Sequence, residues 1–405
     1  MDRRTFLKLA GLTPLYLSQI AEGVTAAEQP VMKFTAATPR NFELLEVKGS
    51  YQQIGYEIGK QFKRNIFQII KRRSRWHTDL LAAKETSKGK MVSKELMKLT
   101  KKHFPSVLEE IRGMAEGAGI DFEHMWAMCI KSELAALGSE PPGCSSIFLK
   151  DQDRLWLFQN EDGHSAYRDL MFMVKVTPPS GVRFMSMVYP GIITGNGPSM
   201  NDRGVVQTTN YIGSTRSEIG IPRYVIGRAI LEAKSAAEAV DIATIEPRAY
   251  PYHHHIAGTS DHSYFSVETT PDASQVKEPK GFYCHTNHLL FEKTREYEHQ
   301  DKKYRSTSSM PRYRVLEKRL LDQVTAGSLK TRPGRAGPGK PEDFLGILSS
   351  HEKAPYSPCR HPEGDVQGTT LGTAFFDLNK GSFRLYKGNP CEAARDMLYT
   401  EFGFS

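Results

Sequence analysis

A cysteine that directly follows a glycine is the residue of this sequence best suited to covalent chemistry. Gly143-Cys144 comes just after Pro141-Pro142. Two prolines cannot continue a helix and impose an extended approach, and a glycine tolerates strained backbone geometry at low cost. We therefore expect the thiol of Cys144 to attack the carbonyl of Gly143, so that the chain cuts itself between these two residues.

Such a cut would give Cys144 a free α-amine, whose ordinary pKa of about 8 lies far below that of a lysine. The amine can act as general base near neutral pH for the thiol of the same residue. The sequence thus predicts a nucleophile and its base on one residue, with no histidine required. The two fragments, which meet at Gly143–Cys144, are expected to stay associated.

A polar segment, Asn160-Glu161-Asp162-Gly163-His164, follows a predicted hairpin. Its strands are expected over 145–149 and 155–159, on either side of a polar turn. Because a hairpin brings its far end back beside its beginning, Asp162 or a neighbour is expected to reach Cys144. A carboxylate there would orient the amine and stabilise its protonated form. Taken alone, the segment is more typical of an ordinary polar turn.

The sequence gives little reason to expect a metal ion. His253-His254-His255 are consecutive, and consecutive residues of a strand point to opposite faces, so the three cannot all face one ion. The five cysteines include no C-x-x-C pair. We predict no metal site and no cofactor. Glu133 lies before the expected cut, in a segment that is expected to cover the nucleophile.

The residues before the cut predict helices. An apolar residue recurs at every fourth position through residues 51–76, which predicts one amphipathic helix. Ser93 is expected to cap a second helix, which Pro105 divides. Asp121 is expected to open a third helix that runs through Leu137.

The residues after the cut predict strands with several helices among them. Beyond the hairpin, strands are expected over 172–176, 183–188, 205–210, 255–257, 264–268, 282–285, 369–376 and 382–387. Helices are expected over 222–233, 236–243 and 312–323. Residues 327–339 are rich in Gly, Pro, Lys and Arg and predict a loop. Long antiparallel sheets with helices on their outer faces would fit this order.

The first residues predict export. Arg3-Arg4-Thr5-Phe6-Leu7-Lys8 has the pattern of a twin-arginine signal, followed by apolar residues 9–20 and by small residues at 24–27. We expect a signal peptide over 1–27 and a periplasmic or secreted protein that folds before export. The apolar run is too short for a comfortable membrane span, so we expect no stable membrane insertion.

The bulk composition is that of a globular protein. Apolar residues make up 39% and charged residues 25% of the 405 residues. The formal net charge of +8 comes from basic residues spread along the chain, and no nucleic-acid module accompanies them. We therefore expect no nucleic-acid partner. The expected partner is a small-molecule amide or peptide substrate.

Six stretches follow one another along the chain. They are Glu116–Asp121, Gly143–Ser146, Gln159–Asp162, Tyr189–Gly191 with Met200–Val205, His285–His288, and Thr369–Leu371 with Gly388–Cys391. In this order they resemble the isopenicillin N acyltransferase family of N-terminal-nucleophile hydrolases, also called the acyl-coenzyme A:6-aminopenicillanic acid acyltransferases. Each is a weak motif alone, and their shared order is what carries the resemblance.

The resemblance implies an α+β fold, a four-layer αββα sandwich, with a helical segment over 28–143 and a catalytic body over 144–405. Carried over by position, Cys144 is the nucleophile, Asp162 its orienting carboxylate and Asn287 a donor to the oxyanion. The residues that it suggests as substrate or oxyanion support are Asn160, Ser309 and Arg312.

The expected function is therefore that of an exported, self-processing amidohydrolase. It would form a thioester on Cys144 and act on an N-acyl compound or small peptide. One alternative is an acyltransferase that moves the acyl group to an amine. An alternative of another class is an inactive relative that uses the cleft to bind a ligand.

Overall fold

The computed structural model describes residues 41–134, 143–151, 153–298, 305–325, 339–393 and 399–403. These described residues belong to one compact unit. The predicted signal peptide, Pro141-Pro142 and all but the last residue of the predicted loop 327–339 lie outside the described residues.

Two large sheets form the centre of this unit. The first has eight strands in the order β1-β4-β5-β6-β7-β8-β9-β10. Its strands are β1 (Glu43–Lys48), β4 (Phe172–Thr177), β5 (Phe184–Val188), β6 (Ser199–Asn201), β7 (Val205–Tyr211), β8 (Tyr252–Gly258), β9 (Ser263–Thr269) and β10 (Ser274–Lys277). Only the β1–β4 pair is parallel among the described strands.

The second sheet is antiparallel, with the order β11-β2-β3-β12-β13-β14. Its strands are β11 (Gly281–His285), β2 (Cys144–Lys150), β3 (Leu155–His164), β12 (Gly368–Asp377), β13 (Ser382–Lys387) and β14 (Tyr399–Phe402). The predicted hairpin is therefore present as β2 and β3. Its second strand continues through the polar segment, whereas we expected that segment to follow the strand.

Helices precede, separate and follow these strands. Those packed outside the eight-stranded sheet are α2 (Tyr51–Gln61), α3 (Lys63–Arg72), α4 (Ser74–Glu85), α5 (Ser87–His103), α6 (Pro105–Ala118), α7 (Phe122–Cys129), α8 (Arg223–Ile230) and α9 (Ala236–Ala243). Those packed outside the six-stranded sheet are α12 (Met310–Thr325), α13 (Pro341–Leu348) and α14 (Pro390–Ala393). The short α10 (Glu292–Arg295), the 3₁₀ turn Ser165–Tyr167 and the π-helical turn Arg305–Ser309 complete the described helices.

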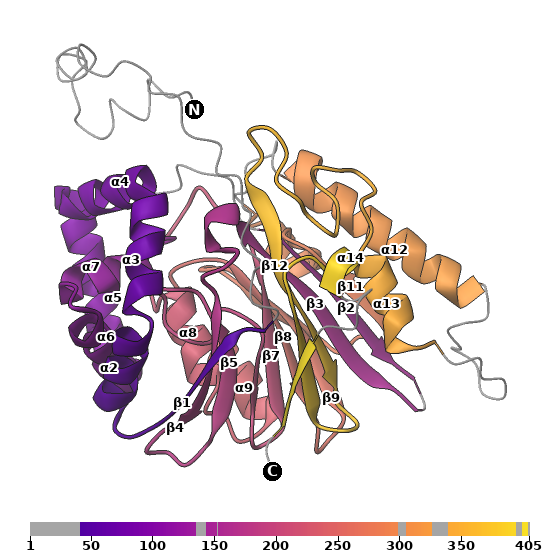
Figure 1. Cartoon of the computed structure of the whole chain (residues 1–405), viewed down its shortest axis with the longest axis horizontal. Coiled ribbons are helices and arrows are strands. Elements are labelled where there is room, and N and C mark those ends of the chain that lie inside the picture. The colour runs from indigo at the N-terminus through magenta and orange to yellow at the C-terminus, as the bar shows by residue number, and fades with distance from the viewer. Residues whose placement is uncertain are drawn as a thin grey trace. The chain divides into compact units, whose positions relative to one another are not determined.

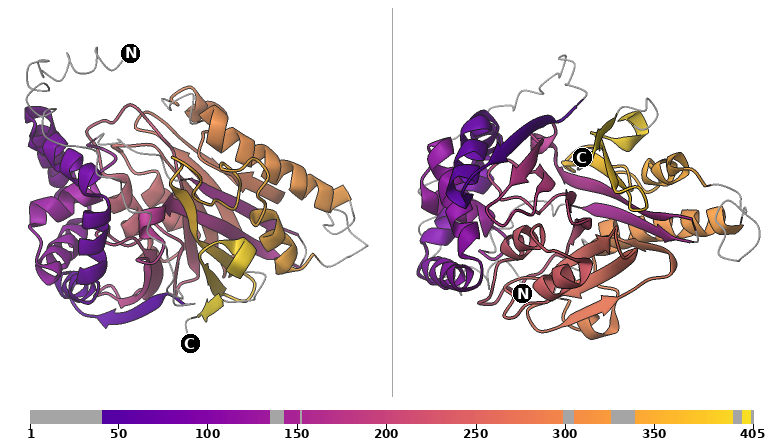
Figure 2. Two further views of the ribbon diagram at one scale, coloured as in Figure 1. Left: turned by 45° about the horizontal axis from the view of Figure 1, so that its top comes forward. Right: turned by 90° about the horizontal axis from the view of Figure 1, so that it is seen from below.

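The elements stack as helices, sheet, sheet, helices, which is the predicted four-layer αββα sandwich (Figure 1, Figure 2). Each sheet buries one face against the other sheet and one against its helices, and this explains why most strand residues are buried on both faces. The segment over 28–143 is mainly helical in its described part. It also adds β1 to the edge of the eight-stranded sheet.

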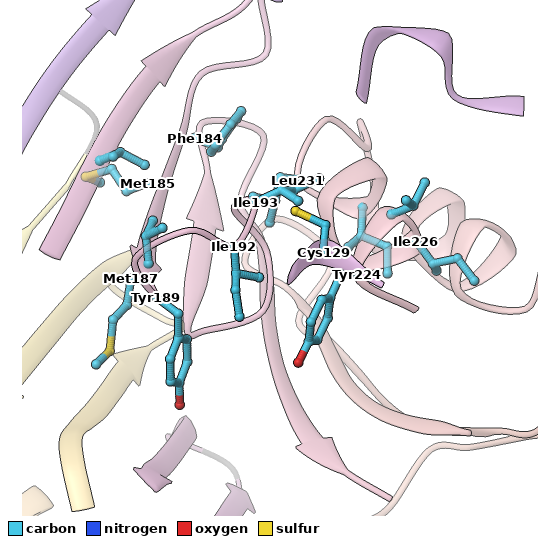
Figure 3. Packing of buried hydrophobic residues seen from close by; sticks show 14 of the residues in the cluster. Cys129, Phe184, Met185, Met187, Tyr189, Ile192, Ile193, Tyr224, Ile226 and Leu231 are labelled. Atoms are coloured by element: carbon cyan, nitrogen blue, oxygen red, sulfur yellow. The ribbon is translucent and has the colours of Figure 1, made fainter. Parts of the chain in front are cut away.

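The larger apolar core extends from the N-terminal helices through the eight-stranded sheet to the inner face of the six-stranded sheet. Figure 3 shows part of it, where Cys129 and Ile193 lie near Leu231. A second core is enclosed by the six-stranded sheet and α12 to α13, and Phe158 stacks there on Phe344 and Phe375. Together the two cores fix both faces of the β2–β3 hairpin.

Several helix boundaries differ from the prediction. The helix expected over 51–76 is divided at Phe62 and Arg73, although its apolar stripe packs on the core, with Ile70 only partly buried. Thr86, not Ser93, caps α5; Ser93 lies inside the helix and accepts a hydrogen bond from Trp126. Pro105 divides the second helix as predicted and becomes the first residue of α6.

The packing of α2 on α6 depends on glycines. A Cβ atom added to Gly55 would lie 1.9 Å from the backbone oxygen of Glu110, and one added to Gly113 would lie 1.9 Å from that of Gln52. Because these distances are far below van der Waals contact, only residues without a side chain allow the two helices to approach so closely. Among the described residues, no helix is long and apolar enough to cross a membrane.

Candidate active site

Cys144 is the first residue of β2, and polar side chains bind both of its backbone groups. Its backbone nitrogen donates to Oδ1 of Asn287 over 3.0 Å, and its carbonyl oxygen accepts from Nη1 of Arg312 over 2.7 Å. Nη2 of Arg312 donates in turn to Oδ1 of Asn287 over 2.7 Å. The side chain of Cys144 is buried. Asn287 and Arg312 thus form a buried, hydrogen-bonded polar frame around Cys144, next to the predicted cleavage bond.

Glu161 is the carboxylate that faces the thiol. Cys144 pairs directly with Glu161 across β2 and β3, so the two side chains lie on the same face of the sheet. Sγ of Cys144 lies 3.7 Å from Oε2 of Glu161. The carboxylate also accepts hydrogen bonds from Nε2 of Gln159 over 2.7 Å and from the hydroxyl of Tyr189 over 2.5 Å. These two neutral donors hold Glu161 within reach of the thiol proton.

Burial changes the acidity of both groups. It raises the pKa of the Cys144 thiol well above its ordinary value, and the Glu161 and Asp162 carboxylates raise it further. Burial also raises the pKa of Glu161 to about 8, although the hydrogen bonds from Tyr189 and Gln159 lower it. A thiol in this environment does not ionise unaided near neutral pH. It needs a base, and Glu161 is the nearest carboxylate to it.

Asp162 lies on the opposite face of β3 from the thiol. Its Oδ1 accepts from the hydroxyl of Thr370 over 2.8 Å, and its buried Oδ2 has no hydrogen-bond partner among the described residues. Burial raises the pKa of Asp162 to about 7, against the opposing effect of Arg360 and Arg312. The structure thus places Asp162 beside guanidinium groups, and its predicted role in orienting the amine stays a prediction.

Asn287 contacts the backbone nitrogen of Cys144 instead of its thiol. Nδ2 of Asn287 donates to the carbonyl of Tyr211 over 2.8 Å, and the backbone nitrogen of Asn287 donates to Oγ of Ser309 over 2.8 Å. This geometry suits a residue that positions the nitrogen that becomes the α-amine after a cut. The predicted role of Asn287 as an oxyanion donor stays a prediction.

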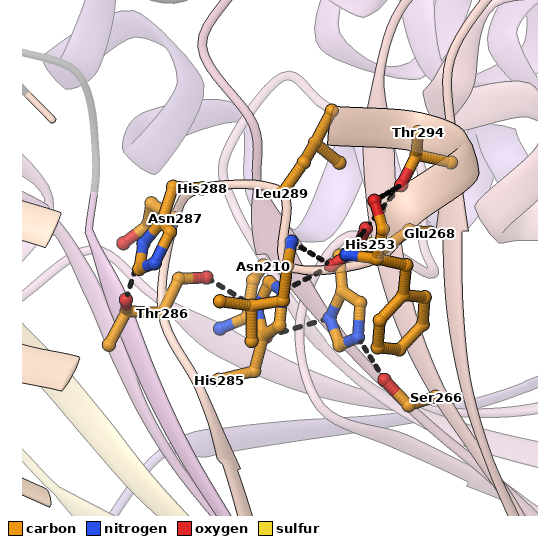
Figure 4. Close-up of polar contacts among 12 residues, drawn as sticks. Asn210, His253, Ser266, Glu268, His285, Thr286, Asn287, His288, Leu289 and Thr294 are labelled. Carbon is orange, nitrogen blue, oxygen red and sulfur yellow. Dashed lines mark hydrogen bonds and ion pairs between the residues drawn. The ribbon is translucent and has the colours of Figure 1, made fainter. Parts of the chain in front are cut away.

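A buried polar network supports the turn that carries Asn287 (Figure 4). The carboxylate of Glu268 accepts from the backbone nitrogen of Leu290 over 2.7 Å and from the hydroxyl of Thr294 over 2.5 Å. Nε2 of His285 lies 3.2 Å from the same carboxylate. Because all of these groups are bonded and buried, the turn is held in one conformation.

Ser309 and Arg312 come from one short segment, in which the π-helical turn Arg305–Ser309 leads into α12. Such turns are frequent at functional sites because they change the direction of side chains within a helix. Nη1 of Arg312 also donates to Oγ of Ser145 over 3.1 Å. The structure therefore brings both predicted residues to the frame around Cys144.

Gly143 lies between two guanidinium groups. A Cβ atom added there would lie 2.8 Å from Nη1 of Arg360 and 3.0 Å from Nη2 of Arg312. We expected a glycine for its tolerance of strained backbone, but its φ lies outside the left-handed range. The missing side chain instead provides space for the arginines. Arg360 is buried, and its Nε and Nη1 have no hydrogen-bond partner among the described residues.

The side chain of Asn160 bonds to segments other than the one that carries Cys144. Its Nδ2 donates to the carbonyls of Leu348 and Pro358, each over 2.9 Å, and its Oδ1 accepts from the hydroxyl of Thr373 over 2.7 Å. Both amide hydrogens are thus used to hold β3 against the end of α13 and the chain that follows it. A role in substrate binding stays a prediction that this geometry does not favour.

The three consecutive histidines alternate across β8 as expected. His253 and His255 both contact Oδ1 of Asn210, at 3.0 and 2.9 Å, whereas His254 contacts Gln207 on the other face. Burial lowers the pKa of all three, so they are neutral at pH 7. Their hydrogen bonds connect neighbouring strands of the eight-stranded sheet.

A cavity opens beside the thiol, and Cys144 and Glu161 form part of its wall. Tyrosines and cations dominate the remaining wall. They are Tyr167, Tyr189, Tyr211, Tyr224, Tyr252, Arg73, Lys131 and Arg223. Burial and the neighbouring arginines lower the pKa of Lys131 to about 7. The cavity therefore combines aromatic surface with positive charge.

Arg223 is the most enclosed of these cations. Its guanidinium lies over the rings of Tyr211, Tyr224 and Tyr252, at 4.6 to 4.8 Å from their centroids. Nη2 donates to Oγ of Ser132, whereas the buried Nε and Nη1 have no hydrogen-bond partner among the described residues. Arg223 thus lines a cavity that adjoins the nucleophile, and two donors of its buried guanidinium are without a hydrogen-bond partner among the described residues.

Sequence reasoning expected Asp162 or a neighbour to reach Cys144 without singling out Glu161, and it assigned no role to Arg360 or Arg223. The alternation of side chains along β3 could have separated Glu161 from Asp162, but only with the hairpin register known. No local pattern marks Arg360 or Arg223, because each reaches the site from a distant part of the chain.

Comparison with known proteins identifies the family. Residues 149–392 match the family described as acyl-coenzyme A:6-aminopenicillanic acid acyl-transferase. The chain belongs to this family. It is therefore an amide-acting hydrolase or acyltransferase of the N-terminal-nucleophile class. The family to which the sequence motifs pointed is confirmed.

Two curated relatives cover most of the chain. A beta-alanyl-dopamine/carcinine hydrolase of Drosophila melanogaster is 21% identical over 86% of this chain and 93% of its own. The 40 kDa form of the acyl-coenzyme A:6-aminopenicillanic-acid-acyltransferase of Emericella nidulans is 24% identical over 84% of this chain and 92% of its own. One relative is thus named a hydrolase and the other a transferase.

Solved structures of a conjugated bile acid hydrolase from Clostridium perfringens also align with the chain. One of them, a mutant form of that hydrolase, is 13% identical and covers 60% of this chain and 89% of its own, with a TM-score of 0.34. A likeness this low carries no argument about the reaction.

Proposed function

We propose that this protein cuts its own chain between Gly143 and Cys144 and then hydrolyses amides that carry a carboxylate. The observation that supports this best is the arrangement around Cys144. Its thiol faces the carboxylate of Glu161, and its backbone nitrogen is bonded to Asn287. Glu161 can thus accept the proton of the Cys144 thiol, and Asn287 fixes the position of the nitrogen that becomes the amine of Cys144.

Self-cleavage begins without an α-amine, so another base has to take the thiol proton. Oε2 of Glu161 is in position to do so. As Sγ of Cys144 bonds to the carbonyl carbon of Gly143, negative charge develops on the carbonyl oxygen. The buried guanidiniums of Arg312 and Arg360 beside Gly143 stabilise that charge.

The intermediate then collapses. The bond between the carbon of Gly143 and the nitrogen of Cys144 breaks, the nitrogen takes up a proton, and a thioester remains on Sγ. Water hydrolyses the thioester, which leaves a carboxylate on Gly143 and a free amine and thiol on Cys144. The two fragments stay associated because β1 of the first is paired with β4 of the second.

In turnover the freed amine acts as the base for the thiol of Cys144. Oδ1 of Asn287 accepts a hydrogen bond from that nitrogen and holds it in place. The positive charge of Arg312, which is bonded to the same oxygen, favours the neutral amine. The thiol then attacks the substrate amide, the amine part leaves, and water releases the acyl group from the thioester.

The cavity supports a substrate with a negatively charged end. A carboxylate could accept from Nε and Nη1 of Arg223, which are otherwise without partners among the described residues. The surrounding tyrosines would contact the apolar part of the substrate. N-acyl amino acids and small peptides combine these features.

Acyl transfer to an amine is the second candidate, because the Emericella nidulans relative is named an acyltransferase. We favour hydrolysis because the Arg3-Arg4 pattern predicts export, and no pool of coenzyme A thioesters is expected outside the cytoplasm. We therefore propose a periplasmic or secreted location.

Purified protein tests the proposal directly. Intact-mass analysis should find a fragment that begins at Cys144, and the Cys144→Ala variant should remain uncut. The protein should then hydrolyse N-acyl amino acids in preference to their methyl esters, which lack the carboxylate. An uncut wild-type chain without amidase activity would instead support the inactive, ligand-binding alternative.

A further inference from the structure

Four potential metal ligands meet at one point outside the six-stranded sheet. They are His351, Cys359, His361 and Cys391, and their ligand atoms all lie within 4.8 Å of one another. His351 follows α13, Cys359 and His361 belong to the chain before β12, and Cys391 belongs to α14. We propose that these four side chains bind one Zn²⁺ ion.

The spacing of the ligand atoms fits a tetrahedral zinc ion. Nε2 of His361 lies 3.5 Å from Sγ of Cys359 and 3.4 Å from Sγ of Cys391. With ordinary Zn–S and Zn–N bonds of about 2.3 and 2.0–2.1 Å, a tetrahedron places sulfur and nitrogen ligands about 3.5 Å apart. The Cys₂His₂ set is one of the common sets of structural zinc sites.

A neighbouring side chain supports the ligand sulfur. Nδ2 of Asn389 lies 3.5 Å from Sγ of Cys359 and donates to it, as outer-shell donors do at metal-bound thiolates. Two thiolates and two neutral imidazoles also balance the charge of a divalent ion. Cys359 is fully buried, so an unpaired thiolate there would be costly, whereas a zinc-bound one would not.

The sequence predicted no metal site because it contains no C-x-x-C pair. The ligands are instead separated by as many as 40 positions, from His351 to Cys391. The strands of the six-stranded sheet and the helices outside it bring them together, which only the folded chain achieves.

The position of the ion suggests what it does. Arg360 lies between two ligands, Cys359 and His361, and its guanidinium reaches Gly143. The backbone nitrogen of Arg360 donates to the hydroxyl of Thr370 over 3.0 Å. We infer that zinc fixes the short loop that holds Arg360 at the cleavage bond. This last step rests on the proposed self-cleavage, whereas the metal site does not.

Metal content tests the site independently of any activity. The full-length Cys144→Ala chain, purified and dialysed against trace zinc, is expected to contain about one zinc ion per chain. His351→Ala in the same chain should lose it, and His351 is exposed, so this variant should fold. His103→Ala, which changes a histidine on α5 outside the cluster, should keep the metal.

Cobalt gives a second readout. Co²⁺ added to the metal-free chain should give the absorption of a tetrahedral thiolate site, and Cys391→Ser should abolish it while Cys284→Ser should not. The proposal is overturned if the chain binds neither metal at micromolar concentration. It is also overturned if mass analysis finds Cys359 and Cys391 joined as a disulfide in the protein as isolated. If zinc binds but its removal leaves the rate of self-cleavage unchanged, the site stands and the link to Arg360 is wrong.

Discussion

Replacing Glu161 by Gln should slow self-cleavage much more than it disturbs the fold. Glutamine has nearly the same size and can still accept the hydrogen bond from the Tyr189 hydroxyl. It cannot take the proton from Sγ of Cys144, which lies 3.7 Å from Oε2 of Glu161. Loss of a positioned general base typically costs about 10²–10⁴ in rate. We expect the variant to fold normally but to remain largely uncut.

The pKa of Glu161 sets the pH dependence of this step. Burial raises it to about 8. A base must be deprotonated to act, so only about a tenth of the chains carry an active base at pH 7, compared with about nine-tenths at pH 9. The rate of self-cleavage in the wild type should therefore rise about tenfold over this interval and level off above the pKa of Glu161.

The assay follows newly made precursor in a cell-free translation reaction that is shifted to pH values between 6 and 9. Gel densitometry of precursor and fragments gives the first-order rate. Glu57→Gln, an exposed change on α2, is the matched control and should follow the wild type at every pH. If Glu161→Gln cuts as fast as the wild type with the same pH profile, Glu161 is not the base of the first step.

Stability provides a separate check on the pKa of Glu161. Its folded pKa of about 8 exceeds the ordinary value of 4.5, so the folded state holds a proton that the unfolded state has lost between these values. The stabilisation by this proton is therefore complete below the pKa of Glu161 in the unfolded state, and it is lost as the pH rises through the pKa of Glu161 in the folded state. In the uncut Cys144→Ala chain, urea titrations should show Glu161→Gln gaining stability relative to Glu161 from pH 5 to pH 8. At about 1.4 kcal/mol per pH unit, the gain over these three units is at most about 4 kcal/mol. A difference that does not change with pH would contradict the raised pKa.

Three further substitutions test other parts of the site. Gly143→Ala would place a Cβ 2.8 Å from Nη1 of Arg360, so it should lower the free energy of unfolding by about 1–3 kcal/mol and block the cut. The control Gly346→Ala, in open space on α13, should do neither, and urea titration and gel analysis compare the two variants. Asn287→Ala removes the oxygen that holds the amine of Cys144 and should lower turnover by about 10²–10⁴ per matured site, counted with a thiol reagent, which is the usual effect of losing a positioned base; an unchanged rate per site would show that Asn287 is only structural. Arg223→Gln should raise KM for N-acyl amino acids at least tenfold with little change in kcat and should leave KM for their methyl esters nearly unaltered; an equal effect on both substrates would refute carboxylate binding.

Much of the architecture followed from the sequence because its signals are local. The apolar stripe from Ile54 to Ile70 predicted the buried face of the first helices, and Pro105 predicted the boundary between α5 and α6. The β2–β3 hairpin and the ordered motifs around Gly143-Cys144 predicted the sheet that carries the nucleophile. Each of these signals depends on neighbours a few residues apart, where backbone sterics and side-chain periodicity act directly.

The chemistry of the site was decided by the tertiary structure. A shift of one residue in the hairpin register exchanges the two faces of a strand, and the sequence does not fix that register. Only the fold therefore determines that Glu161, and not Asp162, faces the thiol. Arg312 and Arg360 lie far along the chain from Gly143, and they reach it only because strand pairing and helix packing join their segments across the six-stranded sheet. Local sequence patterns do not predict such contacts, because the contacts depend on burial and distance in the folded chain.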